Sequence, residues 1–294
     1  MATMLSITNP GDKVVIFSPF YENYGADTIL SGAEPIYVPL VPPEFHFDKE
    51  KLEDAFRQGA KALILCNPSN PCGKVFTMEE MQTIAELAKK YDAYVVTDEV
   101  YEHIVYAPNK HIYMQSLEGM RERTIVCNSL SKTYSITGWR LGYVIANPQI
   151  IDRVKKVHDF LTVGAAAPLM EAAVVGLEFG DGYYDELAAH YAHMKEVFVG
   201  GLKKLGLKYT DPQGAYYVLV DVSEFGVKDD VKFCEWMAQF VGVAAVPGSS
   251  FFREDVHNLV RFHFAKQDDT LNEAIKRLAT LKEKAINAKN VDWR

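Results

Sequence analysis

A chain of 294 residues is long enough to bury a sizeable core, and a chain of this length forms one large domain or two smaller ones. Hydrophobic residues make up 48% of the sequence and charged residues 24%, which argues against a disordered, fibrous or disulfide-built protein. The formal net charge of -8 and the lack of a basic run argue against nucleic acid as a partner, so small molecules are the expected ligands.

Targeting and membrane signals are not evident in the sequence. The first ten residues contain no basic region followed by an apolar one, and the most apolar later stretch, residues 161–179, is interrupted by Pro168 and Glu171. We therefore expect a cytoplasmic protein without a membrane partner. The four cysteines show no CxxC spacing, which predicts reduced thiols and no metal site.

The first half of the chain alternates between strand-like and helix-like segments. Residues 1–8 have the pattern of the last turns of a helix that stops at Asn9. Six short apolar runs follow, and each ends in turn or polar residues; they begin at Lys13, Glu34, Lys61, Ala93, Thr124 and Leu141. This alternation predicts an α/β fold with a mainly parallel sheet flanked by helices. Ligands of such sheets bind at the carboxyl ends of the strands.

The second half begins with a long helical region, residues 149–204, with breaks near Gly164 and Gly180. Strand candidates follow at residues 215–223, 243–252 and 259–266, and residues 271–288 are typical of a closing helix. We therefore predict a large domain over residues 1–178 and a smaller C-terminal α+β domain over residues 179–294.

Lys132 lies in the segment NSLSKTYSITGWRLGY, directly after a predicted strand. A lone lysine in such a place is usually a solvated side chain. Here Ser129 and Ser131 flank it and Arg140 follows, and hydroxyls with a guanidinium are suited to holding a phosphate beside an amine. An amine that is desolvated near another cation has a lowered pKa, which favours the neutral nucleophile.

This segment resembles the cofactor-lysine signature of class I and II aminotransferases, the fold-type I pyridoxal-phosphate enzymes. The similarity covers essentially the whole chain from Asn9 onward. The resemblance implies pyridoxal 5'-phosphate as cofactor, bound by the large domain. It also implies that Lys132 carries the cofactor as a Schiff base and moves the substrate α-proton, and that Ser129 and Arg140 bind the phosphate.

Two further segments agree with the family in order and pattern. CNPSNPCGK resembles its Asn-Pro-x-Asn-Pro-x-Gly turn, with Asn70 in the place of the asparagine that bonds the cofactor's phenolic oxygen and borders the substrate. On its own, this segment is typical of a loop after a strand. TDEVYEH places Asp98 where the family pairs a carboxylate with the pyridine nitrogen, and Tyr101 where it has a phenol near the cofactor oxygen.

Two more assignments come from the ends of the chain. RFHFAK places Arg261 where the family grips the substrate α-carboxylate, although Arg261 and His263 also fit one face of an ordinary strand, with His263 as a bystander. SPFYENYG places Tyr21 on the face of the cofactor, and it leaves Phe20 and Tyr24 as candidate core aromatics.

The resemblance implies transfer of an amino group between an L-amino acid and a 2-oxo acid by a homodimer. The preferred amino acid stays open among aspartate, aromatic residues and kynurenine. Family members also carry an N-terminal arm and a first phosphate-binding turn, which precede the region matched here. Two alternatives follow, a cysteine-conjugate carbon-sulfur β-lyase and a catalytically silent aminotransferase-like module.

Overall fold

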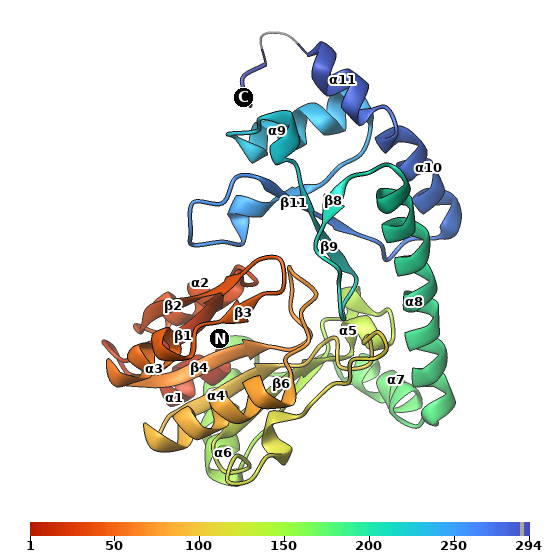
Figure 1. Cartoon of the computed structure of the whole chain (residues 1–294). Coiled ribbons are helices and arrows are strands. Elements are labelled where there is room, and N and C mark those ends of the chain that lie inside the picture. The colour runs from red at the N-terminus through yellow and green to blue at the C-terminus, as the bar shows by residue number, and fades with distance from the viewer. Residues whose placement is uncertain (289–290) are drawn as a thin grey trace.

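The computed structural model describes residues 1–288 and 291–294. Two β-sheets organise these residues, one of seven strands and one of four. In Figure 1 the larger sheet lies below the smaller one, and helix α8 (Asp181–Lys204) runs alongside both. Among the described residues, no helix is long and apolar enough to cross a membrane.

The large sheet has the strand order β3-β2-β1-β4-β5-β6-β7. The five strands from β2 to β6 in this order are parallel, whereas β3 and β7 run antiparallel at the two edges. Nearly every residue of β1 and β4 is buried, as expected for parallel strands with both faces covered. The strands are β1 (Lys13–Ser18), β2 (Glu34–Val41), β3 (His46–Phe47), β4 (Ala60–Cys66), β5 (Tyr94–Asp98), β6 (Thr124–Ser129) and β7 (Gly142–Ile145).

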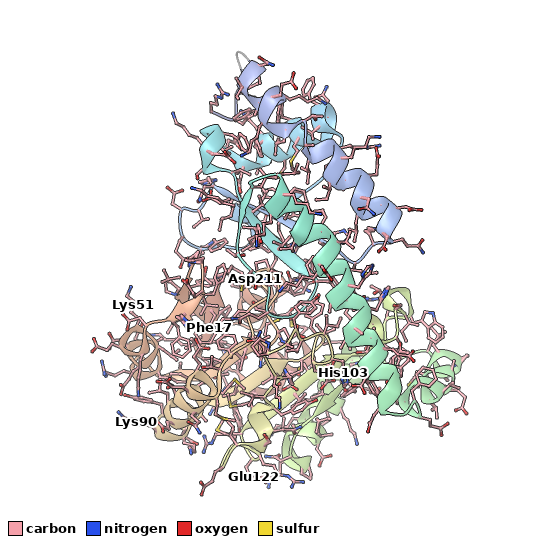
Figure 2. All side chains as sticks on the ribbon, turned by 45° about the vertical axis from the view of Figure 1, so that its right-hand side comes forward. Phe17, Lys51, Lys90, His103, Glu122 and Asp211 are labelled. Carbon is pink, nitrogen blue, oxygen red and sulfur yellow. The ribbon has the colours of Figure 1, made fainter. Side chains whose placement is uncertain are left out.

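Helices cover both faces of this sheet. On one face, α3 (Lys49–Arg57) and α4 (Met78–Lys90) bury Leu52 and Met81. On the other face, α1 (Ala2–Ile7) and α6 (Pro148–Thr162) bury Met4 and Ile150. Figure 2 shows Lys51 and Lys90 pointing away from the sheet into solvent, whereas Phe17 lies inside. The remaining helices beside the large sheet are α2 (Asn23–Leu30), α5 (Leu130–Thr133) and α7 (Ala167–Leu177).

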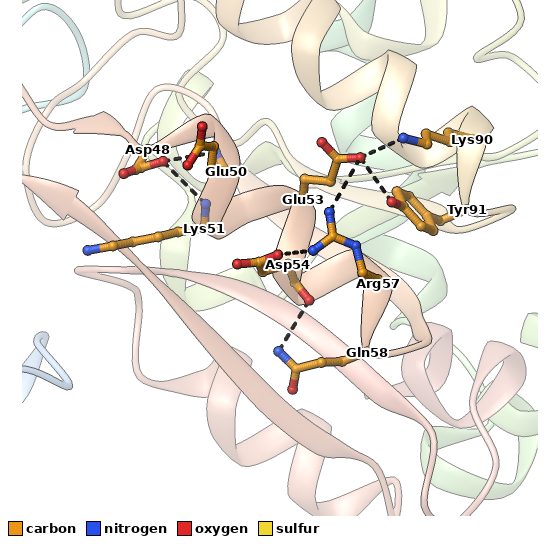
Figure 3. Close-up of polar contacts among 9 residues, drawn as sticks. All are labelled: Asp48, Glu50, Lys51, Glu53, Asp54, Arg57, Gln58, Lys90 and Tyr91. Atoms are coloured by element: carbon orange, nitrogen blue, oxygen red, sulfur yellow. Dashed lines mark hydrogen bonds and ion pairs between the residues drawn. The ribbon is translucent and has the colours of Figure 1, made fainter.

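The start of α3 depends on a side-chain cap, which Figure 3 shows. The Asp48 carboxylate accepts hydrogen bonds from the backbone amides of Glu50 at 2.8 Å and Lys51 at 3.2 Å. Further along the helix, Glu53 accepts from Lys90 and Tyr91, which ties α3 to α4. The cap therefore fixes where α3 begins, and the bonds that Glu53 accepts connect α3 to the end of α4.

Replacing Asp48 with alanine is expected to lower the free energy of unfolding by about 1 kcal/mol, because two amides lose their acceptor. Urea denaturation measures this change. Lys51→Ala is the matched control: it keeps the amide and removes only an exposed side chain, so we expect a change within about 0.5 kcal/mol. Equal effects of the two substitutions would contradict the role of the cap.

The small sheet is antiparallel, with the order β10-β11-β9-β8. Its core also takes Tyr101 and Ile104 from the segment after β5, so the two sheets share packed side chains. These strands and helices are β8 (Lys208–Tyr209), β9 (Tyr217–Asp221), α9 (Asp230–Trp236), β10 (Val246–Pro247), β11 (Leu259–His263), α10 (Asp268–Leu278) and α11 (Leu281–Asn287). The division at residues 178 and 179 fits the turn between α7 and α8, and it stays a prediction.

Most predicted elements are confirmed, including all six strands of the first half and both breaks in the long helical region. The strand predicted at residues 243–252 is much shorter in the structure, because only Val246 and Pro247 pair with β11 and a helical turn follows. A Cβ at Gly248 would collide with the Leu259 carbonyl. The closing helix is divided after Leu278, where the Thr280 hydroxyl donates to the Arg277 carbonyl at 2.8 Å and competes with the helix.

Candidate active site

The candidate site is built at the carboxyl ends of the three neighbouring parallel strands β4, β5 and β6. Asp98 is the last residue of β5, and its backbone is paired with Cys66 on one side and Cys127 on the other. Asn70 follows β4 by four residues, and Lys132 lies on α5, directly after β6. Because parallel strands end at the same edge of a sheet, these side chains meet although they are distant in the sequence.

A cavity of about 480 Å³ opens at this edge. This volume lies in the range of small-molecule sites. All eight residues selected from the sequence line it: Tyr21, Asn70, Asp98, Tyr101, Ser129, Lys132, Arg140 and Arg261. The structure therefore brings the whole predicted set together around one space, while the individual roles of the residues stay predictions.

Asp98 is the half-buried carboxylate of the cavity. Its Oδ2 accepts a hydrogen bond of 2.6 Å from the Tyr24 hydroxyl, and its Oδ1 accepts one of 3.2 Å from the Val100 amide. Burial raises the pKa of the Asp98 carboxyl, and these two hydrogen bonds oppose that rise by stabilising the ionised form. An anion held in this way is suited to pairing with a protonated ring nitrogen.

Lys132 supplies the amine of the cavity. Partial burial lowers the pKa of Lys132, the nearby Arg140 lowers it further, and Asp98 acts in the opposite direction. Ser129 caps the short helix α5 by accepting from the Ser131 amide at 3.1 Å. Arg140 adopts a left-handed backbone conformation and donates to the Thr137 carbonyl at 2.9 Å. The neutral, nucleophilic form of this amine is therefore reached at a lower pH than in an ordinary lysine.

Arg261 reaches the cavity from the small sheet. It lies in the middle of β11, and its Nη1 donates to Asn70 Oδ1 at 2.6 Å across 191 positions of the sequence. Its guanidinium lies 4.2 Å from the centre of the Phe251 ring and 4.4 Å from that of Tyr217. Arg261 is therefore held at the rim of the cavity by contacts from both sheets, whereas His263 on the same strand lies outside the cavity lining.

Two aromatic residues selected from the sequence complete the lining. Tyr21 lies between β1 and α2 and is 37% exposed, with its ring edge-on to Tyr24. Tyr101 is buried, and its hydroxyl lies 3.0 Å from the hydroxyl of Tyr217. Burial raises the pKa of the Tyr101 phenol well above its ordinary value, so it stays protonated and able to donate.

Among the lining residues that were not selected from the sequence, two tyrosines contact selected ones. Tyr24, considered there only as a core aromatic, packs in the core and also hydrogen-bonds Asp98. Tyr217 lies at the start of β9 within an apolar run, so nothing in its local pattern sets it apart from a core tyrosine. The available signal for Tyr24 was its place three residues after Tyr21, in the same aromatic segment that follows β1. Selecting Tyr217 required the register of β9 against β11.

The side chains present fit the cofactor that the sequence resemblance implies. A carboxylate and an amine that are both half-buried converge with two arginines on one cavity, and aromatic rings border it. These are the groups needed to hold a planar ring with a basic nitrogen, an aldehyde and a phosphate.

Comparison with known proteins gives consistent matches. The family model described as aminotransferase class I and II matches residues 1–278. The probable N-succinyldiaminopimelate aminotransferase DapC of Mycobacterium tuberculosis is 35% identical over 96% of this chain and 74% of the relative, and its solved structure superposes with a TM-score of 0.91. Human kynurenine–oxoglutarate transaminase 3 is 33% identical over 92% of this chain and 66% of the relative. Methionine aminotransferase of Escherichia coli is 32% identical over 95% of this chain and 73% of the relative.

Proposed function

The chain belongs to the class I and II aminotransferase family and is an aminotransferase, and from this premise we propose that it works with pyridoxal 5'-phosphate attached to Lys132. The observation that carries the proposal is the convergence of Lys132, Asp98 and Arg261 on one cavity. When bound, the cofactor supplies a carbon that takes the amino group and a ring that accepts the electron pair left by the α-proton.

Asp98 is proposed to bind the protonated ring nitrogen. Its burial makes an isolated negative charge unfavourable, and a cation beside it removes that penalty. The Tyr24 hydroxyl and the Val100 amide hold the carboxylate in one orientation. Tyr21 borders the same space as an aromatic face, and Ser129 and Arg140 are proposed to bind the phosphate.

Lys132 is proposed to remove the α-proton of the amino acid. In the reverse half-reaction, it is proposed to return a proton to the α-carbon. A neutral amine is required for the first step, and the lowered pKa of Lys132 supplies it at a pH closer to neutrality. Arg140 contributes by its charge, because a nearby cation disfavours a second one.

Arg261 is proposed to bind the α-carboxylate of L-amino acids and 2-oxo acids. A guanidinium offers two parallel donors to a carboxylate, and the Asn70 amide fixes its orientation. The two aromatic rings beside the guanidinium shield it from water, which strengthens the pairing.

The first test is direct detection of the cofactor linkage. Purified protein supplied with pyridoxal 5'-phosphate is expected to show a visible absorption band that borohydride removes, with the label on Lys132. Mass spectrometry of the digested protein locates the label. A band that persists in Lys132→Ala, or a label on another lysine, would overturn the assignment.

Amino transfer is then measured with 2-oxoglutarate as acceptor and a panel of L-methionine, L-kynurenine, L-phenylalanine and L-aspartate as donors. The names of the relatives span several amino acids, so the panel determines the preference. Neither alternative raised from the sequence is favoured by these relatives, all of which are named as aminotransferases or transaminases. Formation of pyruvate and ammonia from a cysteine conjugate without acceptor would instead support the lyase. The cytoplasmic location stays a prediction.

We also propose that the chain is a homodimer. Apolar side chains gather on the end of α6 and on α7, where Phe160 is 92% exposed, Val163 81% and Val175 62%. Exposed apolar surface of this extent is unusual for a monomer and marks an interaction site. Light scattering after gel filtration is expected to give twice the chain mass, and Phe160→Glu is expected to favour the monomer. A monomeric wild-type protein would overturn this proposal.

A further inference from the structure

We propose that Tyr217 is a positioning residue that fixes two parts of the site at once, the phenol of Tyr101 and the guanidinium of Arg261. The inference rests on the proposed function, and it assigns to Tyr217 a role in tuning the bound cofactor and in binding the substrate carboxylate. Its basis is a single side chain that contacts both groups, one through its hydroxyl and the other through its ring.

The strand register explains how Tyr217 reaches Arg261. On the antiparallel pair β9 and β11, Tyr217 is opposite His263 and Leu219 is opposite Arg261. Tyr217 is therefore the diagonal neighbour of Arg261 on the same face of the sheet, a spacing that aromatic and long side chains can span. The centre of the Tyr217 ring lies 4.4 Å from the guanidinium, and the centre of the Phe251 ring lies 4.2 Å from it. The two rings limit the rotation of the guanidinium, and Asn70 sets its direction.

The hydroxyl of Tyr217 contacts Tyr101, which follows β5 of the large sheet. It lies 3.0 Å from the Tyr101 hydroxyl, and both phenols are buried. Each hydroxyl has one proton, so only one donates within the pair. When Tyr217 is the donor, the Tyr101 proton is left to bond an acceptor in the cavity, and a hydroxyl that accepts one hydrogen bond donates the next more strongly. Tyr217 thereby strengthens the bond that Tyr101 is proposed to give to the phenolic oxygen of the cofactor.

Two hydrogen bonds therefore cross the cavity between the sheets, Tyr101 with Tyr217 and Asn70 with Arg261. Tyr217 forms the first bond through its hydroxyl, and its ring lies beside Arg261 of the second bond. The ring and hydroxyl functions are separable by substitution, because phenylalanine keeps the ring and leucine keeps neither.

The experiment compares Tyr217→Phe and Tyr217→Leu in the cofactor-loaded protein. Loss of the hydroxyl weakens donation to the phenolic oxygen, so in both variants the pH midpoint of the visible band is expected to rise by roughly half to one unit. The KM for the best donor of the panel is expected to stay within about threefold in Tyr217→Phe. It is expected to rise about three- to thirtyfold in Tyr217→Leu, which also loses the ring against Arg261.

Two further variants serve as controls. Phe251→Leu removes the other ring beside Arg261 and is expected to raise the KM without moving the band midpoint. Tyr191→Phe alters a buried tyrosine that stacks on Tyr216 outside the cavity lining, and it is expected to change neither quantity. Circular dichroism of each variant confirms the fold.

A midpoint that is unchanged in Tyr217→Phe, or a KM that is equal in Tyr217→Phe and Tyr217→Leu, would overturn the inference. These outcomes are separate from failure of the proposed function, since a wild-type protein without a visible band refutes the cofactor assignment itself. The Tyr217 variants are compared with a wild-type protein that shows the visible band.

Discussion

Replacing Lys132 with alanine is expected to reduce amino transfer by about ten-thousandfold or more, the largest effect of any single substitution in the site. The substitution removes both the amine that holds the cofactor and the group that moves the α-proton. Lys132→Arg is the matched control: it keeps a cation at the same place but supplies no neutral amine, so it is expected to be equally inactive. A small primary amine added to Lys132→Ala is expected to restore part of the rate, because a free amine can replace the proton-transfer function of Lys132 but not its covalent hold on the cofactor.

The pH dependence gives a second measure of the same residue. The neutral amine is the base, so the rate rises with pH through the pKa of Lys132 and is lost below it. Because burial and Arg140 lower this pKa, the rise is expected below the ordinary lysine value of 10.5. Stopped-flow measurement of a single half-reaction across pH gives the midpoint. Residual activity above about one hundredth of wild type in Lys132→Ala would contradict the assignment.

Asp98→Asn is expected to lower kcat by about a hundred- to a thousandfold. Asparagine keeps the shape of the aspartate side chain but carries no charge, so it no longer keeps the ring nitrogen protonated. The fold is expected to persist, because the amide oxygen can still accept from Val100 and the amide nitrogen, in the place of the second oxygen, can donate to the Tyr24 hydroxyl. Steady-state kinetics with the best donor measure the loss, and kcat within tenfold of wild type would refute the role.

Tyr24→Phe tests whether the Tyr24 hydroxyl stabilises the ionised Asp98 carboxylate. It is compared with Asp98→Asn, which removes the charge itself. The Tyr24 hydrogen bond lowers the Asp98 pKa, so its removal raises that pKa. Activity requires the ionised carboxylate and is lost as pH falls through this pKa. The acid limb of the rate profile is therefore expected to move to higher pH in Tyr24→Phe, with a smaller loss at neutral pH than in Asp98→Asn. An unmoved acid limb would show that Tyr24 is only a packing residue.

The parallel strands and the residues that follow them could be predicted from the sequence, and the physical reason is local. Buried parallel strands need uninterrupted apolar runs, and the polar residues that end them lie at one edge of the sheet. Asn70, Asp98 and Lys132 each follow such a run, so their convergence followed from chain order. Ser129 and Arg140 belong to the same segment as Lys132 and were placed with it.

The contacts that depend on packing across long separations could not be predicted in this way. The Arg261 bond to Asn70 joins two sheets, and the Tyr217 contacts depend on the β9–β11 register and on how the small sheet sits over the large one. Tyr24 became a partner of Asp98 because α2 directs its hydroxyl at the end of β5. A periodic apolar pattern states which residues are buried, but it carries no information about which polar atom of a buried aromatic finds a partner. The apolar runs and the polar residues after them were therefore enough to predict the large sheet and the set of residues at its edge, whereas the bonds by which those residues hold one another emerged only from the packing of the two sheets.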